Sequence, residues 1–267
     1  MDTKRIPVAI TIAGSDSGGG AGIQADLKAF ARCGVHGTSA ITAITAQSTV
    51  GVDAVHSVPP EIIVAQVRAV AKDIGIDAVK IGMLGTVETI DAVVEALALV
   101  GDAPVVLDPV MVAESGAVLL DPEANRALVE RLLPRATVVT PNVLEARELT
   151  GSDGSVSQED LARAVRELGP QVAVVTGGHT EDGADVLYDG EGEPLRIEGS
   201  VHPAGASHGS GCTHSSVLAA QLARGADARE AAREAKRITS EAVERGLREI
   251  GAGVGPVDVL GITDPLA

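Results

Sequence analysis

Aromatic residues are almost absent from this sequence, which has one Phe, one Tyr and no Trp among 267 residues. Hydrophobic residues still make up 45% of the chain, so the core must be built from Val, Ile, Leu and Ala. Small and branched side chains of this kind are typical of parallel strands that are covered on both faces. The composition therefore predicts a buried, mainly parallel sheet.

Cysteine is also scarce, and long apolar runs are missing. Cys33 and Cys212 are the only cysteines and form no CxxC pair. Two such cysteines exclude a disulfide framework and favour a reducing compartment. No apolar run reaches the length of a membrane span, and no secretory signal is recognisable. We therefore expect a cytoplasmic protein.

The net charge of −16 makes nucleic acid or an anionic membrane an unfavourable partner. Lysine is rare, and most of the positive charge is arginine. A high-salt cytoplasm explains an acidic, lysine-poor surface, because salt screens the self-repulsion. A GC-rich genome explains the same composition, and the sequence leaves both explanations open.

Short apolar runs alternate with amphipathic stretches along the whole chain, which predicts βα units and a parallel sheet with helices on both faces. A hairpin signal, Asp189-Gly190, adds antiparallel edge strands between 184 and 197. No linker divides the chain, so we expect one domain over residues 1–267. The predicted strands are 8–12, 78–81, 105–107, 137–139 and 172–175, and the predicted helices are 22–33, 60–74, 87–99, 123–133, 157–168, 212–224 and 227–246.

The segment His208-Gly209-Ser210-Gly211-Cys212-Thr213 is glycine-rich and opens a helical pattern. Glycine lets a ligand approach the backbone, and the free N–H groups of a helix start bind anions, phosphate above all. Such a position is expected to lower the pKa of the Cys212 thiol. The alternative is that Cys212 is a small buried hydrophobe.

A second glycine-rich loop, residues 14–22, follows the first predicted strand. Its Gly20-Ala21-Gly22-Ile23-Gln24-Ala25 matches a dinucleotide fingerprint, but no acidic residue lies between Asp26 and Asp53 to hold a ribose, which disfavours NAD. The chain has no Gly-Lys dipeptide, which excludes a P-loop. Ligands bind at such loops, beyond the carboxyl ends of the strands.

Carboxylates follow two more strands. Asp108 follows 105–107, and Asn142 and Glu145 follow 137–139 at a helix start marked by Pro141. Residues three apart on a helix share a face, so Asn142 and Glu145 are expected to face one cleft. A carboxylate there suits Mg²⁺ beside phosphates. Helix capping by Glu145 is the alternative, and both remain open.

Taken in order, these motifs closely resemble hydroxymethylpyrimidine/phosphomethylpyrimidine kinases of thiamine biosynthesis. The resemblance covers about residues 7–246 and includes residues 14–28, 45–47, 80–84, 108–113, 140–145 and 208–213. It implies a three-layer ribokinase-like fold, ATP as co-substrate, Mg²⁺ as cofactor, and a homodimer. The runner-up is a pyridoxal kinase on the same fold. A Cys212–His208 thiol hydrolase and a non-catalytic pyrimidine-binding protein are the alternatives from other classes.

The resemblance assigns roles to individual residues. The pyrimidine site is expected to contain Gly14, Ala21, Asp26, Gln47, Met83 and Val110. Within it, Gln47 and Asp26 would hydrogen-bond the ring, and Met83 and Val110 would cover its faces. Asp108 and Glu145 would hold Mg²⁺. The nucleotide would contact Asn142, Thr176, His208 and Thr213. The anion hole would be Gly209, Ser210, Gly211 and Cys212, with Cys212 as a thiolate that accepts the substrate proton or matters by position alone.

The sequence departs from the family pattern near the expected nucleotide. Many members have Lys where this chain has Glu114 and Thr176, and Asp or Asn followed by Thr where it has Ala206 and Ser207. We consider two replacements for the positive charges of these two missing lysines: an arginine from elsewhere in the chain, or a potassium ion.

Overall fold

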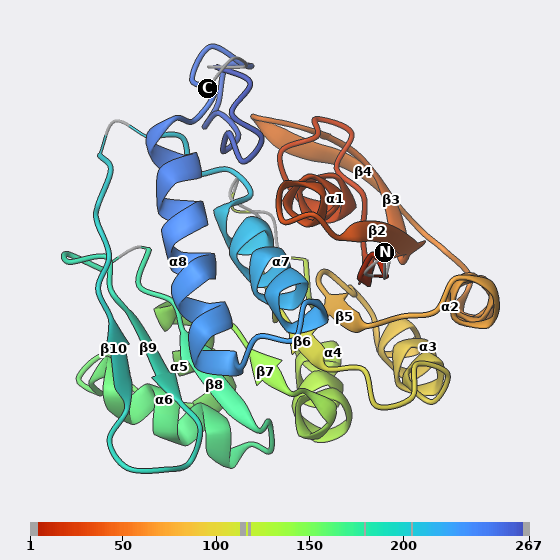
Figure 1. Cartoon of the computed structure of the whole chain (residues 1–267), viewed down its shortest axis with the longest axis horizontal. Coiled ribbons are helices and arrows are strands. Elements are labelled where there is room, and N and C mark those ends of the chain that lie inside the picture. The colour runs from red at the N-terminus through yellow and green to blue at the C-terminus, as the bar shows by residue number, and fades with distance from the viewer. Residues whose placement is uncertain (1–4, 113–115, 117–118, 179, 204, 264–267) are drawn as a thin grey trace.

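An eight-stranded sheet forms the centre of the computed structural model, which describes residues 5–112, 116, 119–178, 180–203 and 205–263 (Figure 1). The strand order is β10-β9-β8-β7-β6-β5-β1-β2. Pairing is parallel from β2 to β8, and β9 and β10 add antiparallel strands at one edge, as predicted. The strands are β1 (Val8–Ala13), β2 (His36–Ile41), β5 (Ala78–Ile81), β6 (Val105–Leu107), β7 (Val138–Val139), β8 (Val172–Val175), β9 (Asp185–Tyr188) and β10 (Leu195–Ile197).

Helices cover both faces of the sheet, which gives the three layers that the composition predicts. Buried side chains on one face come from α1 (Gly22–Arg32), α7 (Ser210–Ala223) and α8 (Ala228–Glu244), with α7 and α8 packed side by side in front of the sheet (Figure 1). The other face is covered by α2 (Pro60–Asp73), α3 (Val87–Leu97), α4 (Pro122–Ala127), α5 (Val143–Thr150) and α6 (Gln158–Glu167). Of the helices within the described residues, none combines the length and apolar character needed to cross a membrane.

Three strands were not predicted. β2 is rich in small and polar residues, and Gly37 allows it to pack closely on α1, because a Cβ there would meet Leu27 at 2.8 Å and Phe30 at 3.0 Å. β3 (Ala43–Ser48) and β4 (Gly51–Ser57) form a separate two-stranded sheet with many exposed side chains. Without a continuous buried face, such strands carry no strong hydrophobic periodicity.

The helix predicted over 123–133 is divided. α4 ends at Ala127, residues Leu128–Leu132 form a π-helical turn, and Leu133–Arg135 form a 3₁₀ turn. Pro134 has no N–H to continue an α-helix, which explains why the segment ends there.

The carboxyl ends of the parallel strands meet at one edge of the sheet. Ala13, Asp108, Thr140 and Thr176 end or follow β1, β6, β7 and β8, and all four line the same cavity. Loops after parallel strands converge at this edge in α/β folds, so the topology places the predicted motifs together.

Candidate active site

A cavity of about 410 Å³ lies at this edge, a volume within the usual range for small-molecule sites. It brings together most of the residues that the sequence singled out. Those lining it are Gly14, Ala21, Gln47, Met83, Asp108, Val110, Asn142, Glu145, Thr176, His208, Gly209, Ser210, Gly211 and Cys212. Two predicted residues, Asp26 and Thr213, are fully buried outside the lining. Glu114 lies outside the described residues.

The two glycine-rich loops contact each other directly. Asp16 accepts hydrogen bonds from the N–H groups of Gly20 and Ala21 at 3.0 and 2.8 Å, and its Oδ2 lies 3.1 Å from His208 Nε2. Burial acts to raise the pKa of Asp16, but His208 and the backbone N–H groups outweigh burial and lower it. Gly209 has φ of 80°, and a Cβ there would collide with the carbonyl oxygen of Gly20. Glycine is therefore required for the contact.

The anion hole is formed by the start of α7. The first N–H groups of a helix have no acceptor within it, so those of Gly211 and Cys212 remain for a ligand. The Ser210 N–H differs from the prediction, because it donates to the Ser207 carbonyl at 2.9 Å. The anion hole therefore has fewer free donors than its four residues suggested.

The lowered pKa expected of the Cys212 thiol is wrong. Burial raises the pKa of the Cys212 thiol to about 12; Lys80 opposes this shift, and the carboxylates of Asp108 and Asp26 add to it. A thiolate is costly where it is desolvated and two carboxylates lie nearby. His208 directs Nε2 to Asp16, so a reactive Cys212–His208 pair, as in a thiol hydrolase, does not fit this geometry.

The direct role expected of Asp26 at the pyrimidine is also wrong. Its side chain is fully buried and accepts hydrogen bonds from Thr11 at 2.6 Å and Ser216 at 2.7 Å. Lys80 Nζ lies 3.0 Å from Asp26 Oδ1 and 3.8 Å from Asp108 Oδ2. Asp26 thus holds Lys80 under the floor of the cavity.

Lys80 is the site residue that the sequence reasoning missed. It lies in β5, all four residues of which are buried, and its own side chain is fully enclosed. Burial acts to lower the pKa of Lys80, but the carboxylates of Asp26 and Asp108 oppose burial, and the net shift is upward. The sequence did contain a signal for Lys80, namely a lysine inside an otherwise apolar strand, because a buried charge requires a partner.

Glu145 caps the helix, which is one of the two roles that the sequence left open. Asn142 Oδ1 accepts from the N–H groups of Leu144 and Glu145, and Glu145 Oε2 accepts from the Asn142 N–H at 2.9 Å, which completes a capping box. Glu145 also lines the cavity. Burial and the charge of Asp108 raise its pKa to about 8.

The carboxylates of Asp108 and Glu145 fit a magnesium ion. Burial also raises the pKa of Asp108, although Lys80 and a 3.0 Å hydrogen bond from Ser215 oppose it. Two carboxylates that repel each other beside a cavity are relieved by a cation. Mg²⁺ binds through one or two carboxylates while retaining waters and phosphate ligands. No larger cluster of acidic, His or Cys ligands occurs within the described residues.

One end of the cavity is formed by Gln47, Met83 and Gly14. Ser17 Oγ accepts from the Gln47 N–H at 2.8 Å and donates to the Gln47 carbonyl at 2.6 Å, which fixes the backbone there. A Cβ on Gly14 would collide with the terminal methyl of Met83. Glycine therefore lets the Met83 side chain lie over this end, as expected of a cover for a flat ring.

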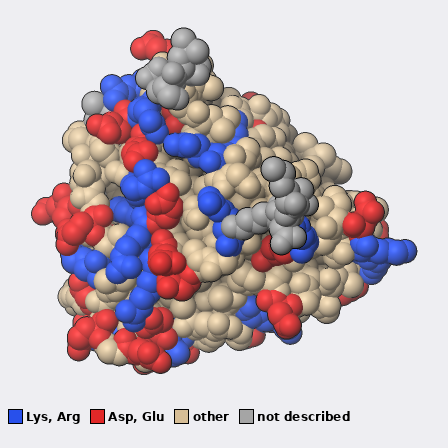
Figure 2. All heavy atoms as spheres, in the orientation of Figure 1, with Lys and Arg blue, Asp and Glu red and all other residues tan. Residues whose placement is uncertain are grey.

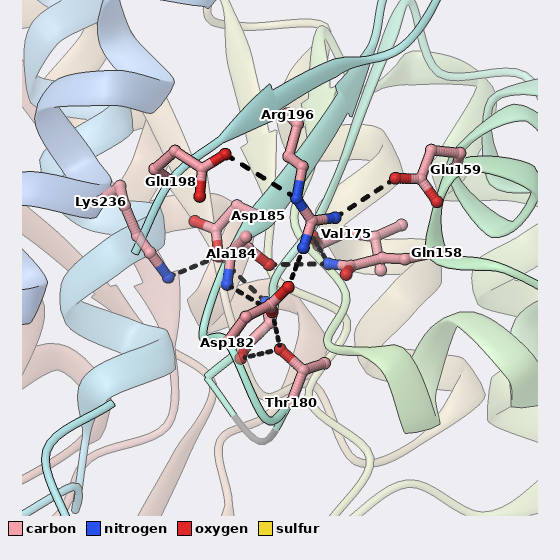
Figure 3. A network of polar contacts seen from close by, with 11 residues as sticks. Gln158, Glu159, Val175, Thr180, Asp182, Ala184, Asp185, Arg196, Glu198 and Lys236 are labelled. Atoms are coloured by element: carbon pink, nitrogen blue, oxygen red, sulfur yellow. Dashed lines mark hydrogen bonds and ion pairs between the residues drawn. The ribbon is translucent and has the colours of Figure 1, made fainter. Parts of the chain in front are cut away.

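The cavity wall also includes charged groups that the sequence analysis did not identify. Asp185 Oδ1 accepts from Lys236 at 2.8 Å (Figure 3). The same oxygen accepts from the Gly177 N–H at 3.0 Å, and Asp185 Oδ2 lies 3.0 Å from His214 Nε2. Burial acts to raise the pKa of Asp185, but His214 and Lys236 outweigh burial and lower it. Asp185, His214 and Lys236 all line the cavity.

The loop beside this cluster is held by a surface network. Arg196 pairs with Asp182 and Glu159, and Gln158 donates to the carbonyls of Val175 and Ala184 at 2.9 and 3.0 Å (Figure 3). These contacts fix both ends of the segment from Thr176 to Ala184. Thr176 and Gly178, at its start, line the cavity.

Acidic and basic side chains alternate on the face formed by α8, although the chain as a whole is strongly acidic (Figure 2). Arg237 pairs with Glu234 at 2.5 Å and Glu241 at 2.6 Å, and Glu241 also lies 3.5 Å from Arg245. Pairs of this spacing stabilise a helix slightly and are screened by salt. This face is therefore unsuited to nucleic acid.

A cavity with a helix-start anion hole, two carboxylates suited to Mg²⁺ and a separate end for a flat molecule defines a small-molecule phosphotransferase of the α/β class. The family model described as phosphomethylpyrimidine kinase matches residues 16–258. The chain belongs to this family. A hydroxymethylpyrimidine/phosphomethylpyrimidine kinase of Rhizobium meliloti is 47% identical over 256 residues, which cover 94% of this chain and 96% of that protein.

Solved structures agree with the fold. A Bacillus subtilis pyridoxal kinase in an ADP complex has a TM-score of 0.87 and 38% identity, with 95% of this chain and 97% of that chain covered. A phosphomethylpyrimidine kinase of Clostridium difficile has a TM-score of 0.79 and 40% identity, with 90% of this chain and all of that chain covered. The predicted ribokinase-like kinase fold is confirmed.

Proposed function

We propose that this protein transfers the terminal phosphoryl group of ATP to the hydroxymethyl group of 4-amino-5-hydroxymethyl-2-methylpyrimidine. It then phosphorylates the monophosphate to the pyrophosphate, within thiamine biosynthesis. Family membership supports the reaction, as do the names of the curated relatives. The observation that carries it is one cavity that is lined both by Gln47 and Met83 and by the Gly209–Cys212 loop.

The residues present account for the chemistry of phosphoryl transfer, which depends mainly on positioning and charge neutralisation. The substrate hydroxyl oxygen attacks the terminal phosphorus, and the bond between that phosphorus and the bridging oxygen of ADP breaks. The hydroxyl proton passes to water or to an oxygen of the transferred phosphoryl group, and the bridging oxygen leaves on ADP. The N–H groups of Gly211 and Cys212 stabilise the charge on the moving group. Asp108 and Glu145 would hold Mg²⁺, which neutralises phosphate charge when bound.

Cys212 acts by its position rather than as a thiolate. Its pKa of about 12 leaves the thiol protonated near neutral pH. The neighbouring Asp108, which lines the same cavity, also has a raised pKa, so its carboxyl retains a proton more readily than a free carboxyl does. Loose transition states need little help from a base, so a neutral thiol next to the anion hole is compatible with turnover.

A coupled ATP-consumption assay with the pyrimidine, and separately with its monophosphate, tests the proposal. We expect ADP release with both substrates, dependent on Mg²⁺, with phosphorus NMR identifying the mono- and pyrophosphate products. Addition of KCl tests whether potassium is needed. Binding of the pyrimidine without any ADP release would instead support a non-catalytic binding protein.

Pyridoxal is the second candidate substrate, because solved structures of pyridoxal kinases match this chain closely. Pyridoxal also has a hydroxymethyl group on a flat heteroaromatic ring. The ratio of kcat/KM values for the two substrates discriminates between the assignments. We expect the aminopyrimidine to be preferred, because Gln47 offers both a donor and an acceptor to its ring.

A further inference from the structure

Asp16 is a fully buried carboxylate at the edge of the cavity. Its side chain does not line the cavity, although its chain neighbour Ser15 and the loop residue Ala21 do. A buried charge is costly unless it is paired, so the partners of Asp16 indicate its role. Because it lies behind the cavity wall, Asp16 acts on a substrate only through the residues that it holds.

Three of the partners of Asp16 are backbone N–H groups of its own loop. Asp16 Oδ1 accepts from the N–H of Gly18 at 2.8 Å, and Oδ2 accepts from those of Gly20 and Ala21. A protein carboxylate therefore already occupies these N–H groups. The glycine-rich loop of residues 14–22 does not offer them to the phosphates of a ligand.

The fourth partner is His208, which precedes α7. Its Nε2 lies 3.1 Å from Asp16 Oδ2, an oxygen that already accepts two N–H groups. An ionised carboxylate only accepts hydrogen bonds, so Nε2 carries the hydrogen and His208 is the donor. The side chain of His208 is 9% exposed and that of Asp16 is fully buried. Water therefore competes little for this hydrogen bond, which strengthens it.

The backbone of His208 is held by a second segment of the chain. Its N–H donates to the Gly255 carbonyl at 3.2 Å, and its carbonyl accepts from the Val257 N–H at 3.1 Å. The same segment contacts the turn between β3 and β4, where the Gly253 N–H donates to Thr49 Oγ1 at 3.2 Å. Both the ring and the backbone of His208 therefore have fixed partners, which fixes the entry of the chain into α7.

Two more contacts continue along the two glycine-rich loops. The backbone at Gly209 approaches the Gly20 carbonyl so closely that no Cβ fits between them. Further along, Gly22 is a backbone hydrogen-bond partner of the Cys212 thiol. The two loops therefore lie against each other as far as Cys212, whose N–H belongs to the anion hole.

We propose that Asp16 is a positioning residue for phosphoryl transfer, which acts through His208 to hold the anion hole against the loop of residues 14–22. This role rests on the proposed kinase function. Positioning supplies much of the rate in this chemistry, and a displacement of about 1 Å costs about 100-fold in rate. Asp16 thus holds the N–H groups of Gly211 and Cys212 in line with the pyrimidine that the loop is expected to contact.

Steady-state kinetics and separate calorimetric titrations with Mg-ATP and with the pyrimidine test this role. In Asp16→Asn, an NH₂ group replaces an oxygen that accepts hydrogen bonds, so one contact of the carboxylate is lost. We expect kcat to fall about 10- to 100-fold, as for the loss of one charged hydrogen bond, while each Kd stays within about threefold of the wild type. Asp153→Asn is the matched control, because Asp153 also accepts a backbone N–H but lies in an exposed turn, and it should have wild-type kcat.

Two variants of His208 separate positioning from a general loss of packing. Glutamine places an N–H group where Nε2 lies and can still donate to Asp16, whereas leucine cannot. The kcat of His208→Gln should therefore exceed that of His208→Leu by about 10-fold. These two variants decide the question by themselves where Asp16→Asn does not fold.

Hydrogen exchange of the ligand-free protein measures the same contact without turnover. Residues 208–216 should exchange about 10-fold faster in Asp16→Asn and in His208→Leu than in the wild type, while the central strands keep their protection. Faster exchange throughout the protein would show a general loss of stability and would overturn the positioning role.

Unchanged kcat in Asp16→Asn would also overturn the assignment, as would equal kcat in His208→Gln and His208→Leu. The proposed function is judged separately, from phosphorylation of the pyrimidine by the wild type. Wild-type protein that phosphorylates no pyrimidine would refute that function, and the exchange of residues 208–216 would still decide whether Asp16 holds the anion hole.

Discussion

Replacing Glu145 by glutamine removes a carboxylate whose pKa is raised from 4.5 to about 8 by burial and by Asp108. An acid whose pKa is raised in the folded state contributes stability that is complete below its unfolded pKa. That stability is lost as pH rises through the folded pKa, because the unfolded chain then releases its proton first. Wild-type stability is therefore expected to fall between pH 4.5 and about 8.

The size of this effect follows from the shift. Each pKa unit corresponds to about 1.4 kcal/mol, so the full shift is on the order of 5 kcal/mol. Glutamine mimics the protonated carboxyl and still has an oxygen to accept the Asn142 N–H of the capping box. Glu145→Gln should match the wild type near pH 4.5 and exceed it increasingly up to about pH 8.

Urea denaturation at several pH values between these limits measures the difference. Glu148→Gln, exposed on the same helix, is the control and should change the free energy of unfolding by less than about 0.5 kcal/mol. Parallel stability curves for wild type and Glu145→Gln across this pH range would refute the reasoning. The Glu145 carboxylate would then be well solvated or balanced by an unidentified cation.

Two further predictions concern the floor of the cavity. Lys80→Met leaves the buried carboxylates of Asp26 and Asp108 unpaired and should cost roughly 3–5 kcal/mol of unfolding free energy in urea; a loss below about 1 kcal/mol would show that the lysine charge is unimportant for the fold. Cys212→Ala should abolish most turnover while leaving calorimetric binding of the pyrimidine intact, and wild-type turnover in this variant would remove the role of Cys212. Slow alkylation of Cys212 at pH 7.5, followed by mass spectrometry, would agree with its raised pKa.

The fold was largely predictable because its central strands are continuous apolar runs. β1, β5, β6 and β8 are buried at every position, which the sequence expresses as runs of Val, Ile, Leu and Ala that contain only two other residues, Thr11 and Lys80. β4 carries no such signal, since most of its side chains are exposed. Its strand character comes from pairing with β3, which no local pattern reveals.

The residues of the site were predicted better than their environments. Strand ends and glycine loops indicated which residues approach the cavity, since topology alone brings them to one edge. The state of Cys212 depends on which groups enclose it, and these come from distant parts of the chain. A helix start alone suggested a lowered pKa, whereas burial beside Asp26 and Asp108 raises it. Tertiary surroundings therefore decided the protonation state.

The glycines of the two loops have a second purpose that the sequence did not indicate. Phosphoryl transfer requires the acceptor and the phosphate to be held in precise alignment, and the two loops are 192 residues apart where Asp16 meets His208. A Cβ on Gly20 would collide with the His208 ring, and one on Gly209 would collide with the Gly20 carbonyl. The glycines that indicate a ligand-binding loop in the sequence are therefore also required for the two loops to contact each other. The loop of residues 14–22 and the anion hole are therefore in direct contact in the ligand-free fold, through Asp16 and His208 and through Gly20 and Gly209.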